Sequence, residues 1–316
     1  MIFVNNHSIV YILAPANANT GGPEAEHQLA SQMIRMGIDS RIVYINHAES
    51  IAHANNWEAY IEYCNPPKEY LKYGVRTDTK IISNTDNILI VPEVYVTLLQ
   101  PEKHIQQAVW WLAVPLFPVD LHLSPYDITH FFQAEYIKDA LKKNNLRELY
   151  SLSDYTREKF LQPSKVDKKD IVVYNPAKGS EYTQQILDKC PDIQFVPICG
   201  MAPEQVHQLL LSAKVYIDFG HHPGKDRIPR EAAISGCCVV VGKRGSAQYF
   251  EDVPIKDIYK IETSPFDVEA AVGMIKNCIQ NYNERINDFS FYRNKIRLEK
   301  ERFQNEIREI FTTVDK

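Results

Sequence analysis

The sequence predicts an α/β protein built from two doubly wound, Rossmann-like domains that face each other across a cleft, followed by a long C-terminal helix. Three observations lead to this prediction. Short apolar, β-branched runs alternate with stretches of helical period along most of the chain. The length of 316 residues corresponds to about two domains. A polar, charged segment, Pro163–Asp170 (PSKVDKKD), separates two such alternating sets and has the composition of a linker.

The first alternating set opens with a β-loop-α-β unit. Strands are expected at Ser8–Leu13 and Arg41–Ile45, with a helix over Pro23–Gly37 between them. Glu24 and Glu26 suit the positive N-terminal end of that helix. Units of this kind build parallel sheets, because their consecutive strands run in the same direction. The pattern predicts further strands at Ile88–Val91, Gln107–Leu112, His130–Gln133 and Leu149–Leu152, and a helix around Tyr136–Lys143.

The second set follows the linker and repeats the alternation. Its expected strands are Ile171–Tyr174, Ile193–Pro197, Val215–Asp218 and Cys237–Val241, and its expected helices are Ser180–Cys190, Ala202–Ser212 and Pro229–Ser235. We therefore predict an N-terminal domain over residues 1–161 and a C-terminal domain over residues 162–316. The latter includes two terminal helices, Phe266–Cys278 and Asn283–Phe311. Apolar residues recur every seven positions in the second, which favours one long helix packed on the domains over a coiled coil.

The composition limits the classes of function. The chain is 45% hydrophobic and 24% charged, which is typical of a globular protein and excludes a disordered one. The net charge of −5 speaks against non-specific nucleic-acid binding, which needs an excess of cations. The sequence shows no signal peptide, no apolar run that could span a bilayer and no C-x-x-C pair. We expect a cytoplasmic protein with reduced thiols, and association with the inner face of a membrane stays open.

Ligands of parallel α/β sheets bind at the carboxyl ends of the strands, so the loops that follow strands are the candidates for chemistry. Gly21 and Gly22 precede a helix, where the backbone can approach an anion closely; a plain tight turn is the alternative. Lys178 stands at a helix start, which the helix dipole disfavours unless an anion binds there; a solvated lysine is the alternative. Arg244 and Gly245 belong to a further basic turn after a strand.

The most informative loop leaves a strand at Asp218 and enters a helix near Glu231 (DFGHHPGKDRIPRE). Its arginines can bind phosphate oxygens through two N–H groups at once, and Glu231 can accept hydrogen bonds from sugar hydroxyls. The candidates in this loop are His221, His222, Gly224, Asp226, Arg227, Arg230 and Glu231. A metal ion held by the two histidines and Asp226 is disfavoured, because adjacent histidines seldom bind one ion and a fourth ligand is not evident.

Several of these motifs resemble retaining glycosyltransferases of family 4, which have the two-domain GT-B fold. The pair Lys178-Gly179 resembles that family's lysine turn, and the run EAAISGCCVV from Glu231 resembles the end of its Glu-x7-Glu motif. The turn Gly242–Ser246 resembles its glycine loop, and Gly21-Gly22 resembles its acceptor-side loop. The resemblance implies that the N-terminal domain faces the acceptor and the C-terminal domain binds a nucleotide-sugar donor.

The resemblance also implies roles for single residues. The donor would be held by Lys178, Gly224, Arg227, Glu231, Arg244 and Gly245, with Glu231 on the nucleotide ribose. The chain departs from the family at the first glutamate of the motif, where Pro223 stands eight positions before Glu231. His221, His222 or Asp226 would replace the missing contact with the donor sugar, and they are the candidate catalytic residues.

The resulting hypothesis is a glycosyltransferase that moves a sugar from a nucleotide diphosphate to a glycan or lipid-linked acceptor in surface polysaccharide synthesis. Neither a metal nor a cofactor is expected, because lysine and arginine can stabilise the charge of the leaving diphosphate. Two alternatives stay open. A GT-B nucleotide-sugar epimerase would be favoured by a carboxylate pair in the N-terminal half, and a catalytically silent GT-B binding protein is favoured by the missing glutamate. The donor, the acceptor and the oligomeric state are not determined by the sequence.

Overall fold

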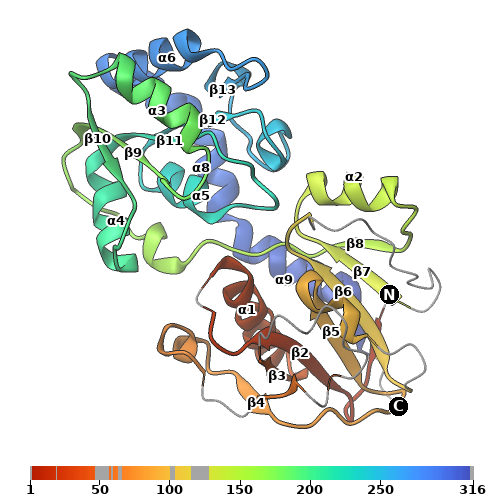
Figure 1. Cartoon of the computed structure of the whole chain (residues 1–316). Helices are drawn as coiled ribbons and strands as arrows, with labels where there is room; N and C mark the ends of the chain where they lie inside the picture. The colour runs from red at the N-terminus through yellow and green to blue at the C-terminus, as the bar shows by residue number, and fades with distance from the viewer. Residues whose placement is uncertain are drawn as a thin grey trace. The chain divides into compact units, whose positions relative to one another are not determined.

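The computed structural model describes residues 2–18, 20–46, 57, 60–62, 66–99, 104–114 and 128–313. The chain divides into two compact units (Figure 1): unit 1 comprises Met1–Tyr155 and Lys300–Lys316, and unit 2 comprises Thr156–Glu299. Each unit is a parallel β-sheet covered by helices, which confirms the predicted fold class. Among the described residues, no helix has both the length and the apolar character to cross a membrane.

Unit 1 is built on a seven-stranded parallel sheet with the order β4-β3-β2-β5-β6-β7-β8. Its strands are β2 (Ile9–Pro15), β3 (Asp39–Ile45), β4 (Arg76–Asp78), β5 (Ile88–Pro92), β6 (Gln106–Trp111), β7 (Ile128–Phe132) and β8 (Leu149–Ser151). The strand order reverses between β2 and β5, so the topological switch point of this sheet lies there. A separate parallel pair, which the sequence does not predict, consists of β1 (Ile2–Val4) and β14 (Phe311–Thr313).

Both faces of this sheet are buried, as β2 illustrates. Val10 and Ile12 belong to one apolar cluster, and Tyr11 and Leu13 belong to a second cluster. Alternate residues of a strand point to opposite faces, so a strand buried on both sides is apolar throughout. The helices of unit 1 are α1 (Gly21–Arg35), η3 (Lys68–Tyr73), η4 (Glu93–Leu98), α2 (Glu135–Lys143) and α9 (Glu299–Ile310). The first cluster includes apolar residues of α1 and α9, and the second includes those of η4 and α2.

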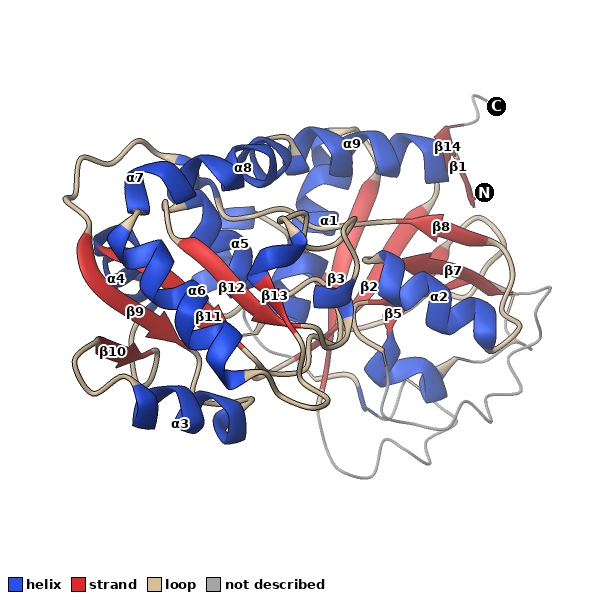
Figure 2. Cartoon of the chain, turned by 90° about the horizontal axis from the view of Figure 1, so that it is seen from above, coloured by secondary structure: helices blue, strands red, loops and turns tan. Residues whose placement is uncertain are grey.

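Unit 2 is built on a five-stranded parallel sheet with the order β10-β9-β11-β12-β13 (Figure 2). Its strands are β9 (Lys169–Tyr174), β10 (Gln194–Pro197), β11 (Ala213–Asp218), β12 (Cys238–Gly242) and β13 (Lys260–Ile261). Its longer helices are α3 (Ser180–Lys189), α4 (Pro203–Ser212), α5 (Arg227–Ile234), α6 (Val268–Gln280) and α8 (Ser290–Arg297). Here the strand order reverses between β9 and β11, which places the switch point next to the loops that follow these strands.

The C-terminal tail differs from the single long helix predicted over Asn283–Phe311. It consists of α7 (Tyr282–Arg285), η8 (Ile286–Phe289), α8, α9 and the strand β14. The regular helix stops at the exposed Leu298, between α8 and α9. Ile296 packs in the core of unit 2, whereas Phe303 packs in the core of unit 1. The seven-residue spacing therefore reflects apolar faces buried in two different units.

This division also differs from the predicted domains 1–161 and 162–316. The chain passes from unit 1 to unit 2 after Tyr155, and the segment from Lys300 onward belongs to unit 1. The physical reason is the packing of Phe303, whose ring centroid lies 5.7 Å from that of Tyr155 and 6.4 Å from that of Trp110. A large aromatic side chain of the tail thus completes the core of the first unit.

Candidate functional site

Three loops meet at the carboxyl edge of the unit 2 sheet. Residues 175–179 connect β9 to α3, residues 219–226 connect β11 to α5, and residues 243–245 connect β12 to the short helix η6 (Ser246–Gln248). Since β9, β11 and β12 are neighbours in one parallel sheet, their carboxyl ends lie side by side. The loops singled out in the second half of the sequence are therefore brought together at the switch point.

Two glycines allow these loops to approach one another. Gly179 has a φ of +66°, and a Cβ atom added there would lie 2.5 Å from the backbone nitrogen of Gly220. Gly245 has a φ of +61°, and a Cβ atom there would overlap the carbonyl oxygen of His222. That carbonyl accepts a hydrogen bond from the N–H of Ser246 at 2.9 Å. Any larger residue at either glycine would separate the loops.

The Lys178 ammonium group forms ion pairs with two carboxylates at this edge. Its Nζ atom contacts the carboxylate of Asp226 and lies 3.3 Å from Oδ2 of Asp218. Asp218 is the buried last residue of β11, and it also accepts hydrogen bonds from the Tyr216 hydroxyl and the Gly220 N–H, each at 3.0 Å. Sequence reasoning proposed Lys178 as a cation for an external anion. In the structure its charge is balanced by two carboxylates, and an anionic ligand must compete with them.

His222 is fully buried between the same two carboxylates. Its Nε2 atom lies 3.5 Å from Oδ1 of Asp218, and its Nδ1 atom lies 3.9 Å from Oδ2 of Asp226. Burial raises the pKa of Asp218, but His222 and the charge of Lys178 outweigh this effect and hold that pKa at about 2. Asp218 is therefore ionised at neutral pH. His221 is exposed, and desolvation and the Arg244 charge lower its pKa.

Asp218, His222 and Asp226 place three ligand-type atoms within 4.8 Å of one another. The metal site weighed from the sequence consisted of His221, His222 and Asp226. In the structure the cluster contains Asp218 in place of His221. The Lys178 ammonium pairs with both carboxylates of this cluster, so a positive charge is already provided there. That the site works without a metal ion stays a prediction.

Arg244 lies beside the first loop and its helix. Its guanidinium carbon is 5.2 Å from the ring centroid of Tyr182, and Nη1 lies 3.4 Å from the Glu181 carboxylate. Nη1 also lies 3.4 Å from the carbonyl oxygen of Phe219, in the second loop. With 32% of the side chain exposed, Arg244 combines a fixed position with access to a ligand.

The other predicted donor residues lie along the second loop and α5. Gly224 is buried in the loop, and its carbonyl accepts a hydrogen bond from the Ser246 hydroxyl at 2.6 Å. Arg227 is the first residue of α5 and is partly buried. Because α5 begins there and not at Pro229, Glu231 lies beyond the first turn, where it is 8% exposed. The prediction that places Glu231 in the first turn is therefore wrong, because the helix begins two residues earlier than predicted.

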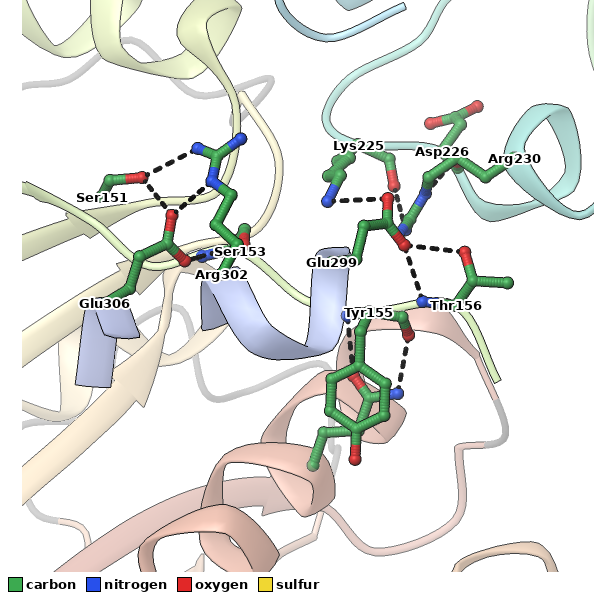
Figure 3. Close-up of polar contacts among 11 residues, drawn as sticks. Ser151, Ser153, Tyr155, Thr156, Lys225, Asp226, Arg230, Glu299, Arg302 and Glu306 are labelled. Atoms are coloured by element: carbon green, nitrogen blue, oxygen red, sulfur yellow. Dashed lines mark hydrogen bonds and ion pairs between the residues drawn. The ribbon is translucent and has the colours of Figure 1, made fainter. Parts of the chain in front are cut away.

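Arg230 does not serve as the anion-binding arginine that the sequence suggested. It is 1% exposed, and its Nη1 donates to Oε2 of Glu299 at 3.1 Å (Figure 3). Its Nε and Nη2 donate to the carbonyl oxygens of Asp226 and Lys225 at 3.2 and 3.0 Å. Glu299 also pairs with the Lys225 ammonium at 3.1 Å and accepts two hydrogen bonds from Thr156 at 2.8 Å. This buried network holds the end of the second loop, and with it Asp226.

In unit 1, Gly21 and Gly22 are the first residues of α1, not part of the loop before it. Asn19 lies outside the described residues. Gly22 lines a cavity of about 520 Å³ together with two glutamates, Glu26 and Glu93. Sequence reasoning missed this pair, because Glu26 fits the solvated N-terminal turn of a helix equally well. The available signal for Glu93 was its position directly after a buried strand.

The sequence matches no family model, and no curated protein matches it. The structure resembles that of HepE from Anabaena in complex with UDP-glucose, with a TM-score of 0.65, 11% identity and coverage of 96% of this chain and 98% of that chain. It also resembles the pneumococcal O-GlcNAc transferase GtfA in complex with UDP and GlcNAc, with a TM-score of 0.64, 9% identity and the same coverage. Sucrose-phosphate synthase from Thermosynechococcus elongatus gives a TM-score of 0.62 at 11% identity, again with coverage of 96% and 98%.

Identities this low carry information about the fold alone. The similarity extends over nearly the whole of this chain and of the compared chains, so it includes both units and not a single Rossmann-like sheet. The chain therefore has the α/β fold, with two parallel sheets, of GT-B glycosyltransferase structures.

Proposed function

We propose that this protein is a glycosyltransferase that uses a nucleotide-sugar donor, bound at the carboxyl edge of the unit 2 sheet. The observation that carries the proposal is the meeting of three strand-end loops at the switch point, with Lys178 and Arg244 on them. The N-terminus of α3 adds N–H groups beside Lys178. Two structures of similar fold contain UDP-glucose or UDP, which supports this class of ligand.

In this proposal the charged side chains stabilise the leaving group. Lys178, Arg227 and Arg244 contact the diphosphate, Gly224 and Gly245 let it approach the backbone, and Glu231 binds the ribose. The bond between the anomeric carbon and the diphosphate oxygen breaks, and stabilisation of the developing phosphate charge lowers the barrier. Asp226 and the exposed His221 face the sugar. His222 is fully buried, so we assign it to positioning Asp226 and Asp218.

The acceptor in this proposal is a glycan or a lipid-linked sugar, and the pathway is surface polysaccharide synthesis. The reaction runs in the cytoplasm and needs no metal ion, because cationic side chains neutralise the diphosphate. Whether the protein associates with the inner face of a membrane depends on the acceptor.

A thermal-shift panel of UDP, ADP and GDP tests the proposal. A ligand at 100 times its Kd stabilises the folded state by about 2.7 kcal/mol, so one of the three should raise the Tm measurably. Lys178→Ala should remove that shift. The matched control is Lys165→Ala, which removes an exposed lysine of the linker and should retain it. If no nucleotide shifts the wild-type Tm, the donor-binding proposal fails; a shift without release of the nucleotide from any sugar donor supports the silent binding protein.

A nucleotide-sugar epimerase is the second candidate, and one observation favours it. The N-terminal half holds two carboxyl groups, Glu26 and Glu93, in one cavity. An epimerase that inverts a carbon centre by removing its hydrogen exchanges that hydrogen with solvent. Incubation with UDP-sugars in D2O distinguishes the two functions, because an epimerase of this type incorporates deuterium into the sugar and a transferase does not.

A further inference from the structure

Unit 1 contains a cavity of about 520 Å³ at the switch point of its own sheet. Its walls include Pro15 and Pro92, the last residues of β2 and β5, and Leu112, which follows β6. Thr20 and Gly22, at the start of α1, complete this side of the wall. The crevice beyond the carboxyl ends at a switch point is where ligands bind in sheets of this kind. The volume lies in the range of roughly 300–1,000 Å³ that is typical of small-molecule sites.

Two glutamates are the ionisable groups among the described residues that line this cavity. Glu26 is 1% exposed, and its Oε2 atom is buried without a hydrogen-bond partner among the described residues. Glu93 is partly exposed, and its Oε2 accepts a hydrogen bond from the N–H of Leu112 at 2.9 Å. The described lining contains no positive charge that could pair with either carboxyl. A buried polar atom without a partner is costly to the fold, which points to a ligand that satisfies it.

The surroundings of the pair favour retention of a proton near neutral pH. Burial raises the pKa of Glu93 to about 7, although backbone hydrogen bonds from Leu112 and Ala113 lower it. Burial raises the pKa of Glu26 well above its ordinary value, and the charge of Glu93 adds to this effect. Among the described residues, Tyr95 also interacts with Glu26, and burial and the Glu26 charge raise the pKa of Tyr95. At pH 7 the pair therefore offers both a carboxylic acid and a carboxylate.

We propose that Glu26 and Glu93 form an acid–base pair that binds a neutral, polyhydroxylated ligand in this cavity and removes the proton of the hydroxyl group that reacts. Sugar hydroxyls both donate and accept hydrogen bonds, which matches one protonated and one ionised carboxyl. An anionic sugar is disfavoured, because the described lining provides a carboxylate and no cation. This role rests on the proposed function, since a donor sugar must be supplied for the hydroxyl to attack.

The proton transfer belongs to a balanced group-transfer step. The O–H bond of the ligand hydroxyl breaks and its proton goes to the carboxylate of the pair. The freed oxygen electrons form a bond to the anomeric carbon of the donor sugar, and the bond from that carbon to the diphosphate oxygen breaks. The nucleoside diphosphate leaves with the electron pair, and the carboxyl group later returns its proton to water. General-base catalysis of this kind typically contributes a factor of about 10²–10⁴ to the rate.

Ligand-observed NMR with glucose, galactose, N-acetylglucosamine and glucuronate tests the binding part. A neutral sugar should bind, glucuronate should not, and Glu93→Gln should weaken the neutral sugar by about tenfold through loss of a charge-assisted hydrogen bond. The matched control is Glu69→Gln, which neutralises an exposed carboxylate in the same unit. Absence of binding by every neutral sugar, equal binding of glucuronate, or an equal effect of the control overturns the proposal.

The pH dependence of transfer tests the catalytic part. In the wild type, kcat/KM should fall about tenfold per pH unit below the apparent pKa near 7, because protonation removes the base. Glu93→Gln should lower kcat at least 100-fold and abolish this limb. Its affinity for UDP should not change, because the proposed donor loops belong to unit 2. An unchanged pH profile in Glu93→Gln overturns the base role, as does incorporation of solvent deuterium into the sugar. Failure of the donor proposal can be distinguished from failure of this inference. In the first case UDP does not bind to the wild type, whereas neutral sugars still bind to unit 1.

Discussion

At the scale of single residues, Lys178 is shared between two carboxylates, and this sharing predicts an unusual effect on affinity. We expect Asp226→Asn to strengthen binding of UDP by up to about tenfold, because it releases the ammonium group from one ion pair and removes a negative charge from the phosphate site. Titration calorimetry at low salt measures this change.

The control for this substitution is Asp188→Asn, which makes the same change of charge at an exposed position of α3 and should leave the affinity near that of the wild type. Weaker binding in Asp226→Asn would contradict the competition model, and it would indicate that Asp226 itself contacts the nucleotide part of the donor. The corresponding substitution Asp218→Asn is less informative. The ionised Asp218 carboxylate also accepts hydrogen bonds from Tyr216 and Gly220, so its replacement would disturb more than the ion pair with Lys178.

The buried Arg230–Glu299 pair predicts a second effect at this scale. Replacing Glu299 by leucine removes a counter-charge of the buried Arg230 guanidinium, which should lower the free energy of unfolding by about 3–5 kcal/mol. The double variant Arg230→Met/Glu299→Leu should recover the part of that loss that comes from the Arg230 guanidinium, because apolar groups of similar volume replace both charges, while the contacts of Glu299 with Lys225 and Thr156 stay lost. Urea denaturation of the two single variants and the double variant measures the difference; additive losses in the double variant would contradict a coupled pair.

At the scale of elements, the longer apolar strands could be predicted, whereas the short strands β1, β4, β13 and β14 and the structure of the tail could not. β2, β5 and β12 are apolar along their whole length, because parallel strands are buried on both faces, and this pattern is local in the sequence. The spacing of Phe303 and Ile296 is equally regular, but which core each side chain enters depends on contacts with distant residues. The helix is interrupted at Leu298 because of those contacts. Leucine is a good helix former, so the residue itself does not indicate the interruption.

The packing of α9 in unit 1 predicts that its aromatic anchor is essential to that unit. Phe303→Ala should lower the free energy of unfolding of unit 1 by about 3–5 kcal/mol, because it leaves a cavity beside Trp110 and Tyr155. The three tryptophans of the chain all belong to unit 1, so the midpoint of the fluorescence transition in urea reports on this unit.

The matched control is Phe3→Ala in β1 of the same unit, where the ring is 57% exposed and the loss should stay below about 1 kcal/mol. Polar contacts also hold α9 in place. Glu306 accepts hydrogen bonds from the Ser151 hydroxyl at 2.8 Å and from the Ser153 N–H and hydroxyl at 2.7 Å (Figure 3). If both phenylalanine variants shifted the fluorescence transition equally, α9 would not be part of the core of unit 1.

At the scale of the whole molecule, the candidate sites combine local motifs with partners distant in the sequence. The loops of Lys178 and Arg244 could be predicted, because glycine and basic residues after a buried strand form a local pattern. The ion pairs of Lys178 with Asp226 and of Arg230 with Glu299 link residues 48 and 69 positions apart, so no spacing in the sequence indicates them. Glu26 and Glu93 belong to one cavity for the same reason, since the sheet places β2 beside β5.

The balance of buried ionisable groups predicts how the stability of unit 1 depends on pH. Burial lowers the pKa of His27 and of His130 to about 4, so between pH 6.5 and 4 the unfolded chain binds more protons and stability falls as the pH falls. Burial raises the pKa of Glu93 to about 7, so between pH 4.5 and 7 the folded chain binds more protons and stability falls as the pH rises. Glu26 acts in the same direction as Glu93.

These opposing effects should make the wild-type stability nearly independent of pH between 4.5 and 6.5. Glu93→Gln removes one of the two carboxyl contributions and leaves both histidines, so its free energy of unfolding should fall on acidification more steeply than that of the wild type, by about 1.4 kcal/mol per pH unit. Urea titrations followed by tryptophan fluorescence at several pH values measure the slope. Glu69→Gln, at an exposed position, should follow the wild type. A Glu93→Gln curve parallel to the wild type would mean that Glu93 titrates alike in the folded and unfolded chain, and the cavity would then lack its proton-holding pair.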